Sequence, residues 1–202
     1  MSAEHWDEVY ATRGVDQVSW FEPDPATSLR LVEAAAPERS AAIVDVGAGA
    51  SSLVDRLIDA GYVDVTLLDV SRRALETVRT RLGDRATGVT FVADDVLDWV
   101  PERVFDVWHD RVAFHFLIDE VDRARYVERA AATVRPGGTL IVATFAADGP
   151  TNCSGLPVHR HEAADLARTF SPAFVLEAAE REEHVTPADL VQPFTWAVLH
   201  RS

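Results

Sequence analysis

Lysine is absent from this chain of 202 residues, because all 19 of its Lys and Arg positions are Arg. These 19 cations face 33 Asp and Glu residues, which gives a net charge of −14. An acidic protein is repelled by nucleic acid and by anionic membrane surfaces unless it carries a local basic patch, and the Arg residues are scattered. The composition therefore predicts no nucleic-acid partner and no membrane partner.

Disulfides and long hydrophobic runs are also missing. The single Cys153 excludes an internal disulfide and fits a reducing compartment. The longest uncharged run, 136–147, is far shorter than the roughly 20 apolar residues of a membrane span. The acidic start MSAEHWDEVY fits neither a secretory signal nor a transit peptide. We therefore expect a cytoplasmic protein.

No repeat or Gly/Ser-rich linker divides the chain, so one domain over 1–202 is expected, with a core over 37–202. Strand-length apolar runs alternate with segments of helical period, which predicts an α/β three-layer sandwich. Its doubly wound, mostly parallel sheet is expected to end in an antiparallel hairpin, because a short loop near Pro187 joins the last two strands. The expected strands are 41–46, 63–70, 88–93, 104–109, 139–145, 173–185 and 192–200, and the expected helices are 51–60, 71–82, 118–134 and 162–169.

A glycine turn follows the first expected strand. Gly47-Ala48-Gly49 stands where free helix N–H groups and a tight backbone can approach a ligand closely. Many α/β folds turn in this way, and Ser52 occupies the place of the third glycine of the dinucleotide fingerprint. The turn therefore favours nucleotide binding, whereas the missing third glycine disfavours a dinucleotide pyrophosphate as the ligand.

Carboxylates end the next two strands. Asp69 is placed to accept both hydroxyls of a ribose, although a strand-end Asp can also cap the next helix. Ser71 is better placed for that cap. Asp94 and Asp95 follow the third strand, where one carboxylate can take the exocyclic amine of adenine while the other caps a short helix through Trp99.

These motifs resemble, in order and spacing over roughly 40–145, those of the class I S-adenosylmethionine-dependent methyltransferases. They are VDVGAGAS (44–51), LLDVS (67–71), VADDV (92–96), FDVWHDR (105–111) and VRPGGTLIVATF (134–145). The closing antiparallel pair matches the seven-stranded sheet of that family. The resemblance implies a methyltransferase that uses S-adenosylmethionine as its cofactor.

The resemblance also implies the cofactor contacts. The glycines pass against the methionine part, Asp69 holds the ribose, Asp94 with its neighbours holds the adenine, and Asp45 lies near the amino group. The residues concerned are Asp45, Gly47, Ala48, Gly49, Asp69, Val70, Asp94, Asp95 and Val96.

Residues 1–36 resemble N-terminal segments that cover the cofactor as a lid in some members of the family. This would bring Trp6, Tyr10 and Trp20 beside the sulfonium, where aromatic faces stabilise a cation by about 0.5–2 kcal/mol each. The alternative is that these rings and Phe21 are core packing of an amphipathic first helix.

The acceptor side should lie beyond the fourth and fifth strands. His109 and His115 are candidate bases, although His115 also fits a half-buried histidine with a backbone partner. Arg111 could orient an anionic substrate, but pairing with Asp110 is the favoured alternative. The Asp/Asn-Pro-Pro-aromatic tetrad of the enzymes that methylate adenine or glutamine is absent, which disfavours such targets.

The loop over 143–161 is rich in Gly and Pro and carries Cys153, His159 and His161. It could line a substrate pocket or lie as a plain surface loop. The spacing of the three residues matches no standard metal-ligand pattern, so no metal is expected.

The sequence thus predicts transfer of a methyl group to an O, N or S nucleophile of a small molecule, by a monomer or homodimer. A protein-lysine methyltransferase is the alternative within the class. From other classes, an NAD-dependent oxidoreductase and a non-catalytic cofactor-binding protein remain open.

Overall fold

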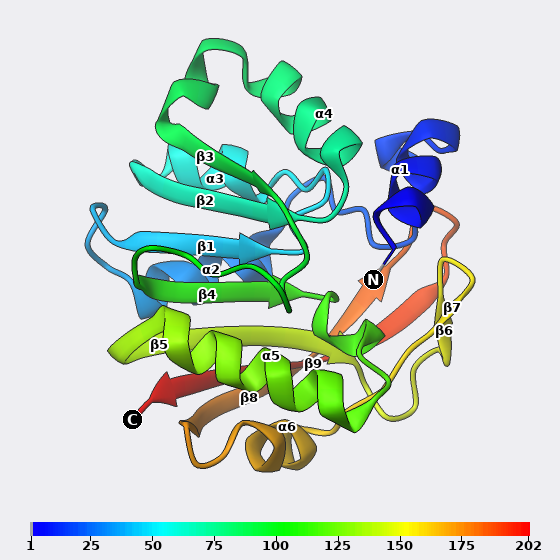
Figure 1. The fold of residues 1–202 in the computed structure, drawn as a ribbon. Coiled ribbons are helices and arrows are strands. Elements are labelled where there is room, and N and C mark those ends of the chain that lie inside the picture. Colours follow the sequence, from blue (N-terminus) through cyan, green and yellow to red (C-terminus); the bar gives the residue numbers. More distant parts are fainter. Residues whose placement is uncertain (1) are drawn as a thin grey trace.

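The computed structural model describes residues 2–202 and is built on a seven-stranded sheet (Figure 1). The strand order is β3-β2-β1-β4-β5-β9-β8. The strands are β1 Ala42–Val46, β2 Asp64–Asp69, β3 Val89–Ala93, β4 Phe105–Arg111, β5 Val134–Phe145, β8 Phe174–Val185 and β9 Val191–Arg201. The predicted α/β sheet with its closing hairpin is confirmed.

The first five strands are parallel, so their carboxyl ends meet at one edge. All five residues of β1 are buried, as expected for a central strand covered on both faces. In the register, Asp45 on β1 lies beside His109 on β4. The strand order reverses at β1, because β2 and β3 follow on one side of it while β4 and β5 follow on the other. The crevice at such a switch point is where open α/β sheets bind ligands.

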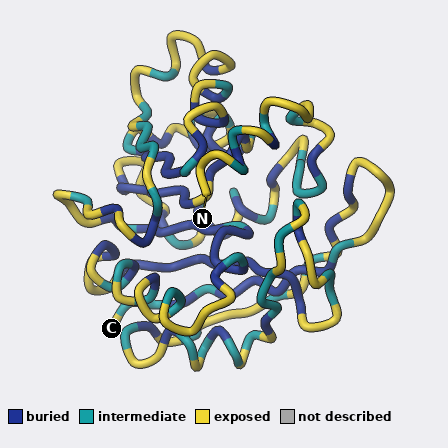
Figure 2. The backbone as a smooth tube through the Cα atoms, turned by 45° about the vertical axis from the view of Figure 1, so that its right-hand side comes forward, coloured by how far each residue is buried: buried dark blue, intermediate teal, exposed yellow. Residues whose placement is uncertain are grey.

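Helices cover both faces of the sheet (Figure 1). One core cluster joins residues of α2, α3 and α4 to the sheet, and a second joins residues of α5 and α6 to the opposite face. The central strands β1 and β4 are almost entirely buried, whereas the edge strand β8 is largely exposed, and Figure 2 shows a dark blue centre surrounded by exposed yellow turns. The helices are α2 Ala26–Ala35, α3 Leu53–Asp59, α4 Arg72–Leu82, α5 Glu120–Thr133 and α6 Ala163–Phe170.

The antiparallel end was predicted correctly, with two shifts of boundary. β9 pairs with both β5 and β8 in antiparallel register, and residues 186–190 connect β8 to β9. β5 begins at Val134 rather than at Thr139, because Val134 already pairs with Phe105. β4 continues through Arg111, so Asp110 and Arg111, which were expected just after this strand, are its last two residues.

Two segments stand beside the carboxyl edge of the sheet (Figure 1). The first holds α1 (Ala3–Thr12) and a short 3-10 helix, η1 (Val15–Gln17); we call residues 3–25 the cover segment. The second is a small hairpin of β6 (Asn152–Cys153) and β7 (Leu156–Pro157), which interrupts the loop expected over 143–161.

The remaining short elements are the 3-10 helices η2 (Gly83–Gly88) and η3 (Phe114–Phe116). The short helix expected through Trp99 is wrong: residues 95–99 form only hydrogen-bonded turns. Among the helices of residues 2–202, none combines the length and apolar character that crossing a membrane requires.

Candidate functional site

A cavity of about 100 Å³ lies between the carboxyl edge of the sheet and the cover segment. Most of the residues predicted for the cofactor line it, together with apolar residues of the cover segment. Its lining includes Trp6, Tyr10, Val18, Trp20, Phe21, Glu22, Ser28, Asp45, Gly47, Ala48, Asp69, Val70, Asp94, Val96, His109, Arg111, Phe116 and Cys153.

The turn after β1 requires its two glycines. Gly47 and Gly49 have φ of +65° and +53°, a region that residues with a side chain rarely adopt. A Cβ on Gly47 would lie 2.4 Å from Cβ of Ala113, and one on Gly49 would lie 2.4 Å from the hydroxyl of Tyr10. The backbone therefore forms a close-fitting cradle that any side chain would fill.

Asp69 ends β2 as a buried carboxylate that orders this cradle. Its two oxygens accept hydrogen bonds from the backbone N–H groups of Gly49 (2.8 Å) and Ser71 (2.7 Å). Burial raises the pKa of Asp69 to about 6, although both hydrogen bonds oppose the shift. Each carboxylate oxygen can still accept a further bond, so the group remains available to a pair of hydroxyls.

The two carboxylates after β3 have different positions. Asp94 lines the cavity, whereas Asp95 is not among the lining residues. The side chain of Asp95 accepts the N–H of Leu97 at 2.9 Å and so orders the turn. Asp95 therefore orders the turn, whereas Asp94 stands in the cavity wall.

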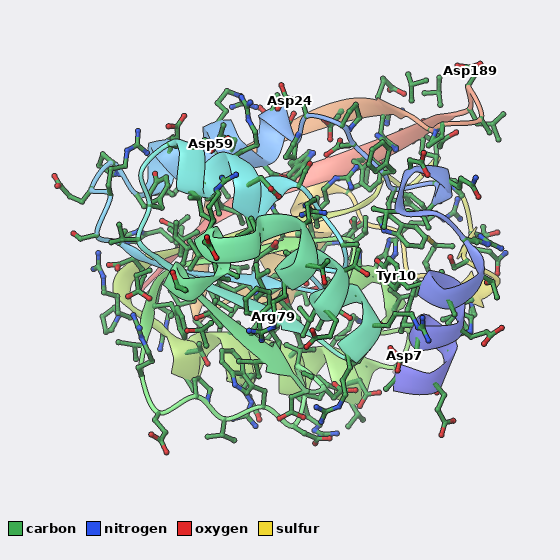
Figure 3. The ribbon with its side chains drawn as sticks, turned by 90° about the horizontal axis from the view of Figure 1, so that it is seen from above. Asp7, Tyr10, Asp24, Asp59, Arg79 and Asp189 are labelled. Carbon is green, nitrogen blue, oxygen red and sulfur yellow. The ribbon has the colours of Figure 1, made fainter. Side chains whose placement is uncertain are left out.

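The cover segment contributes an aromatic wall. Trp6 packs edge-on against Trp20 (centroids 5.7 Å apart) and Phe116 (5.1 Å), and Tyr10 packs edge-on against Trp20 (6.3 Å). In Figure 3, Asp7 and Tyr10 lie on the side of α1 that faces the rest of the molecule. The rings pack together as a small core, and Trp6, Tyr10, Trp20 and Phe21 also line the cavity.

Asp7 attaches α1 to the start of α4. Its carboxylate accepts the hydroxyl of Ser71 (2.6 Å) and the N–H of Arg73 (3.2 Å). Ser71 is the N-cap of α4, as predicted, because its hydroxyl accepts the N–H of Ala74. The cover segment and the Asp69 turn therefore share one residue, Ser71.

His109 is held between two buried side chains in the cavity wall. Its Nδ1 lies 2.7 Å from Asp45 Oδ1 and its Nε2 lies 3.0 Å from Ser28 Oγ. A carboxylate only accepts, so Nδ1 donates to Asp45, and in the neutral ring Nε2 then accepts the hydroxyl of Ser28. His109 therefore stands in the cavity wall with both ring nitrogens paired.

Arg111 does not pair with Asp110, and that expectation is wrong. Its guanidinium forms a partly buried ion pair with Glu22 (2.9 Å) and donates to the carbonyl of Trp20 (2.8 Å). Asp110 lies on the other face of β4, where its carboxylate accepts the N–H groups of Ala113 and Phe114. Alternate residues of a strand point to opposite faces, which separates these neighbours.

The same cover segment is held a second time by His184 on β8. Nε2 of His184 donates to the carbonyl of Ser19 at 2.7 Å, and its Nδ1 lies 3.5 Å from Glu22. The residues over 19–22 are therefore attached to two strands that are distant in sequence.

The remaining histidines lie away from the cavity. His115 is fully buried, lies outside the cavity lining, and neither ring nitrogen has a hydrogen-bond partner, so the expected backbone partner is wrong. Burial lowers the pKa of His115 to about 3 and that of His161 to about 4. His159 and His161 pack against each other at 4.4 Å between ring centroids, also outside the lining.

Cys153 on β6 reaches the cavity, and burial raises the pKa of its thiol to about 11, which keeps it protonated at neutral pH. Within residues 2–202 no group of three His, Cys, Asp or Glu side chains has a geometry that could hold a metal ion.

Glu22 and Ser28 line the cavity but were not predicted as site residues. Both lie in the N-terminal region, whose spacing carries no motif for them. Glu22 stands in HWDEVYATRGVDQVSWFE, the segment that was matched only as a lid, and Ser28 lies within an apolar helical pattern. The partner residues are on β4, so only the fold reveals these contacts.

Two observations indicate that the cavity suits S-adenosylmethionine. The glycine cradle would be filled by a single Cβ, and the buried carboxylate of Asp69 stands next to it. The acidic groups and aromatic wall also suit a ligand that carries a sulfonium and an ammonium.

Comparison with known proteins agrees with this fit. Residues 43–138 match the sequence model of a family described as a methyltransferase domain. A mouse protein named eEF1A lysine and N-terminal methyltransferase is 25% identical over 190 residues, which are 85% of this chain but 26% of that protein. A zebrafish (Danio rerio) EEF1A lysine methyltransferase 2 is 28% identical over 69% of this chain and 66% of its own length.

Solved structures share the fold over the whole chain. One solved structure has a TM-score of 0.80 at 20% identity, and the match covers 99% of this chain and 92% of that one. It is described as the conversion of a disulfide bond into a thioacetal group during echinomycin biosynthesis. A Burkholderia thailandensis 1,6-didemethyltoxoflavin N1-methyltransferase with bound S-adenosylhomocysteine has a TM-score of 0.72 at 20% identity, covering 100% and 84%.

Residues 43–138 therefore match a methyltransferase domain in sequence, and the chain shares its fold with solved methyltransferases. These matches support the predicted enzyme class and its cofactor, S-adenosylmethionine.

Proposed function

We propose that the protein transfers the methyl group of S-adenosylmethionine to a nucleophilic atom of a small molecule. The observation that carries this proposal is the cavity itself, which the cover segment and the β6–β7 hairpin close over the sheet edge. A bound cofactor would supply an activated methyl group, so the chain's own residues have to align the acceptor and exclude water. Such alignment is worth about 7–11 kcal/mol.

The proposed cofactor contacts follow the cavity lining. Asp69 holds the ribose with Val70 beside it, Asp94 and Val96 hold the adenine, and Gly47 and Ala48 pass along the methionine part. Trp6, Tyr10 and Trp20 face the sulfonium, and Gly49 acts through the bond that its N–H donates to Asp69.

On the acceptor side, His109 is proposed as the base, and Arg111 and Cys153 line the acceptor end. His115, His159 and His161 lie outside the cavity lining, so we assign them no contact with the acceptor.

Two measurements test this proposal in order. Calorimetry with S-adenosylhomocysteine and with NAD should show binding of the first alone. A panel of phenols, amines, thiols and carboxylates is then incubated with S-adenosylmethionine, and release of S-adenosylhomocysteine is measured. Release with one or more small acceptors supports the proposal, and absence of binding by S-adenosylhomocysteine contradicts it.

A protein-lysine acceptor is the second candidate, favoured by the names of the two curated relatives. The net charge of −14 would also attract a basic protein substrate. Incubation with purified eEF1A and labelled cofactor separates the candidates, because only this one predicts label on the protein.

A further inference from the structure

Three side chains in the cavity wall form a linear chain of hydrogen bonds. Ser28 on α2, His109 on β4 and Asp45 on β1 are joined through contacts of 3.0 and 2.7 Å. Each residue is at most 3% exposed, yet all three line the cavity. A polar chain so deeply buried is stable only when every member is paired, and this one is.

The order of the three residues determines which atom meets a ligand. Nδ1 of His109 is occupied by Asp45, and Nε2 is occupied by the hydroxyl of Ser28. The ring of His109 is further packed against Trp196, with centroids 6.0 Å apart, so it has a fixed position. An acceptor that seeks the basic nitrogen therefore meets Ser28 Oγ first, and this oxygen keeps its lone pairs for a further proton.

From this geometry we infer that Ser28, His109 and Asp45 form a proton relay, and that the acceptor is a nucleophile that arrives carrying its proton. The inference rests on the proposed function. As the acceptor atom bonds to the methyl carbon, its proton passes to Ser28 Oγ, and the hydroxyl proton of Ser28 passes to Nε2 of His109. The resulting imidazolium is stabilised by Asp45 and later returns its proton to solvent. Ser28 is the catalytic contact, and Asp45 is a positioning residue.

The charged groups near this relay are two carboxylates and Arg111, which shares the cavity lining and the face of β4 with His109. Asp69 interacts electrostatically with Asp45, Asp110 interacts with His109, and Trp196 covers the imidazole.

The deciding experiment uses the intact protein and phenylmethylsulfonyl fluoride as the probe. A hydroxyl whose proton is taken by a histidine attacks the sulfonyl sulfur, so that an O–S bond forms, fluoride leaves and the proton passes to Nε2. Mass spectrometry of the peptide over 14–30 then reports modification of Ser28, while Ser19 and Thr27 in the same peptide serve as internal controls.

We expect Ser28 to be modified at least tenfold faster in the wild type than in His109→Gln. Glutamine can keep hydrogen bonds to Asp45 and to Ser28 but cannot take the proton, so a purely structural role would leave the rate unchanged. Exposed His200→Gln is the matched control and should react as the wild type does. Asp45→Asn is expected to slow the modification as His109→Gln does.

Equal rates in the wild type and in His109→Gln, or no modification of Ser28, would overturn the relay. Calorimetry with S-adenosylhomocysteine on the same samples keeps the two proposals apart. Binding without activation of Ser28 contradicts the relay alone, whereas absence of binding contradicts the proposed function. In the wild type, S-adenosylhomocysteine should also protect Ser28 from the probe.

Discussion

The two halves of the cavity are built in different ways. On the β1–β3 side, backbone groups shape the site, because the N–H groups of Gly49 and Ser71 orient Asp69. Ser71 is close to Asp69 in the sequence, and Gly49 follows the adjacent strand. On the β4 side, side chains meet across the fold, and Arg111 lies 91 positions from the Trp20 carbonyl that it holds. The first half is encoded locally, and the second depends on the whole chain being folded.

This difference predicts that mutations in the two halves impair different properties of the protein. Removing the side chain of Asp69 should damage cofactor affinity while the contacts of Glu22 with Arg111 and His184 still hold the cover segment. Changes on the β4 side should release the cover segment first.

The largest expected effect is on the β4 side. Arg111→Ala removes both the partly buried ion pair to Glu22 and the bond to the Trp20 carbonyl, so we expect a loss of about 3 kcal/mol in the free energy of unfolding. Hydrogen exchange should show protection lost over residues 13–25 and kept over 42–50. Arg30→Ala, which removes an exposed ion pair to Glu180, is the matched control and should be nearly neutral. Uniform loss of protection would contradict the division.

Asp69→Ala should act on the cofactor side. It removes the acceptor for two ribose hydroxyls, so the Kd for S-adenosylhomocysteine should rise roughly 100-fold, with the cover segment still protected. Calorimetry measures the affinity, and circular dichroism checks the fold. Asp59→Ala, which alters an exposed carboxylate paired with Arg85, should bind as the wild type does. Unchanged affinity in Asp69→Ala would remove the ribose assignment.

The two glycines of the cradle give a sharper test, because they face different halves. Gly47→Ala forces a Cβ against buried Ala113 and should cost about 2 kcal/mol of stability. Gly49→Ala meets only the hydroxyl of Tyr10, which can move, so the cost in stability should be smaller and α1 should become less protected. Thermal unfolding and hydrogen exchange distinguish the two variants. Equal loss in both would show that Tyr10 is as rigid as the core.

The smallest effect is the pH dependence of cofactor binding. Burial raises the pKa of Asp69 to about 6, so its ionisation costs folding stability as the pH rises through this value. A ligand whose hydroxyls bind the ionised form is therefore held fully above pH 6, and its affinity falls by up to about tenfold per pH unit below it. Calorimetry between pH 7.5 and 5 measures this. The slope should vanish in Asp69→Ala, and its persistence there would assign it to another group.

Much of the fold and the β1–β3 half of the site could be predicted from the sequence. The turn at Gly47 and the strand-end Asp69 depend on residues whose neighbours in space are also neighbours in sequence or on the adjacent strand. Alternation of strands and helices then determines which edge they share.

The β4 half could not be predicted in the same way. The sequence suggested Asp110 for Arg111 because the two are adjacent, but adjacent residues on a strand point to opposite faces. Glu22 and Ser28 carry no periodic signal, and their partners Arg111 and His109 become close only when the cover segment and α2 dock. For the same reason His115, a plausible base by composition, was not recognised as an interior residue behind Phe116 and Phe145.

Ser71 donates its N–H to Asp69 and its hydroxyl to Asp7, and it therefore connects the first helix to the Asp69 end of the cavity. A fusion partner or affinity tag that displaces residues 3–12 would also displace Ser71, and through it the carboxylate of Asp69. Apparent cofactor affinities measured with and without such an extension should consequently differ, even though the extension touches no strand of the sheet.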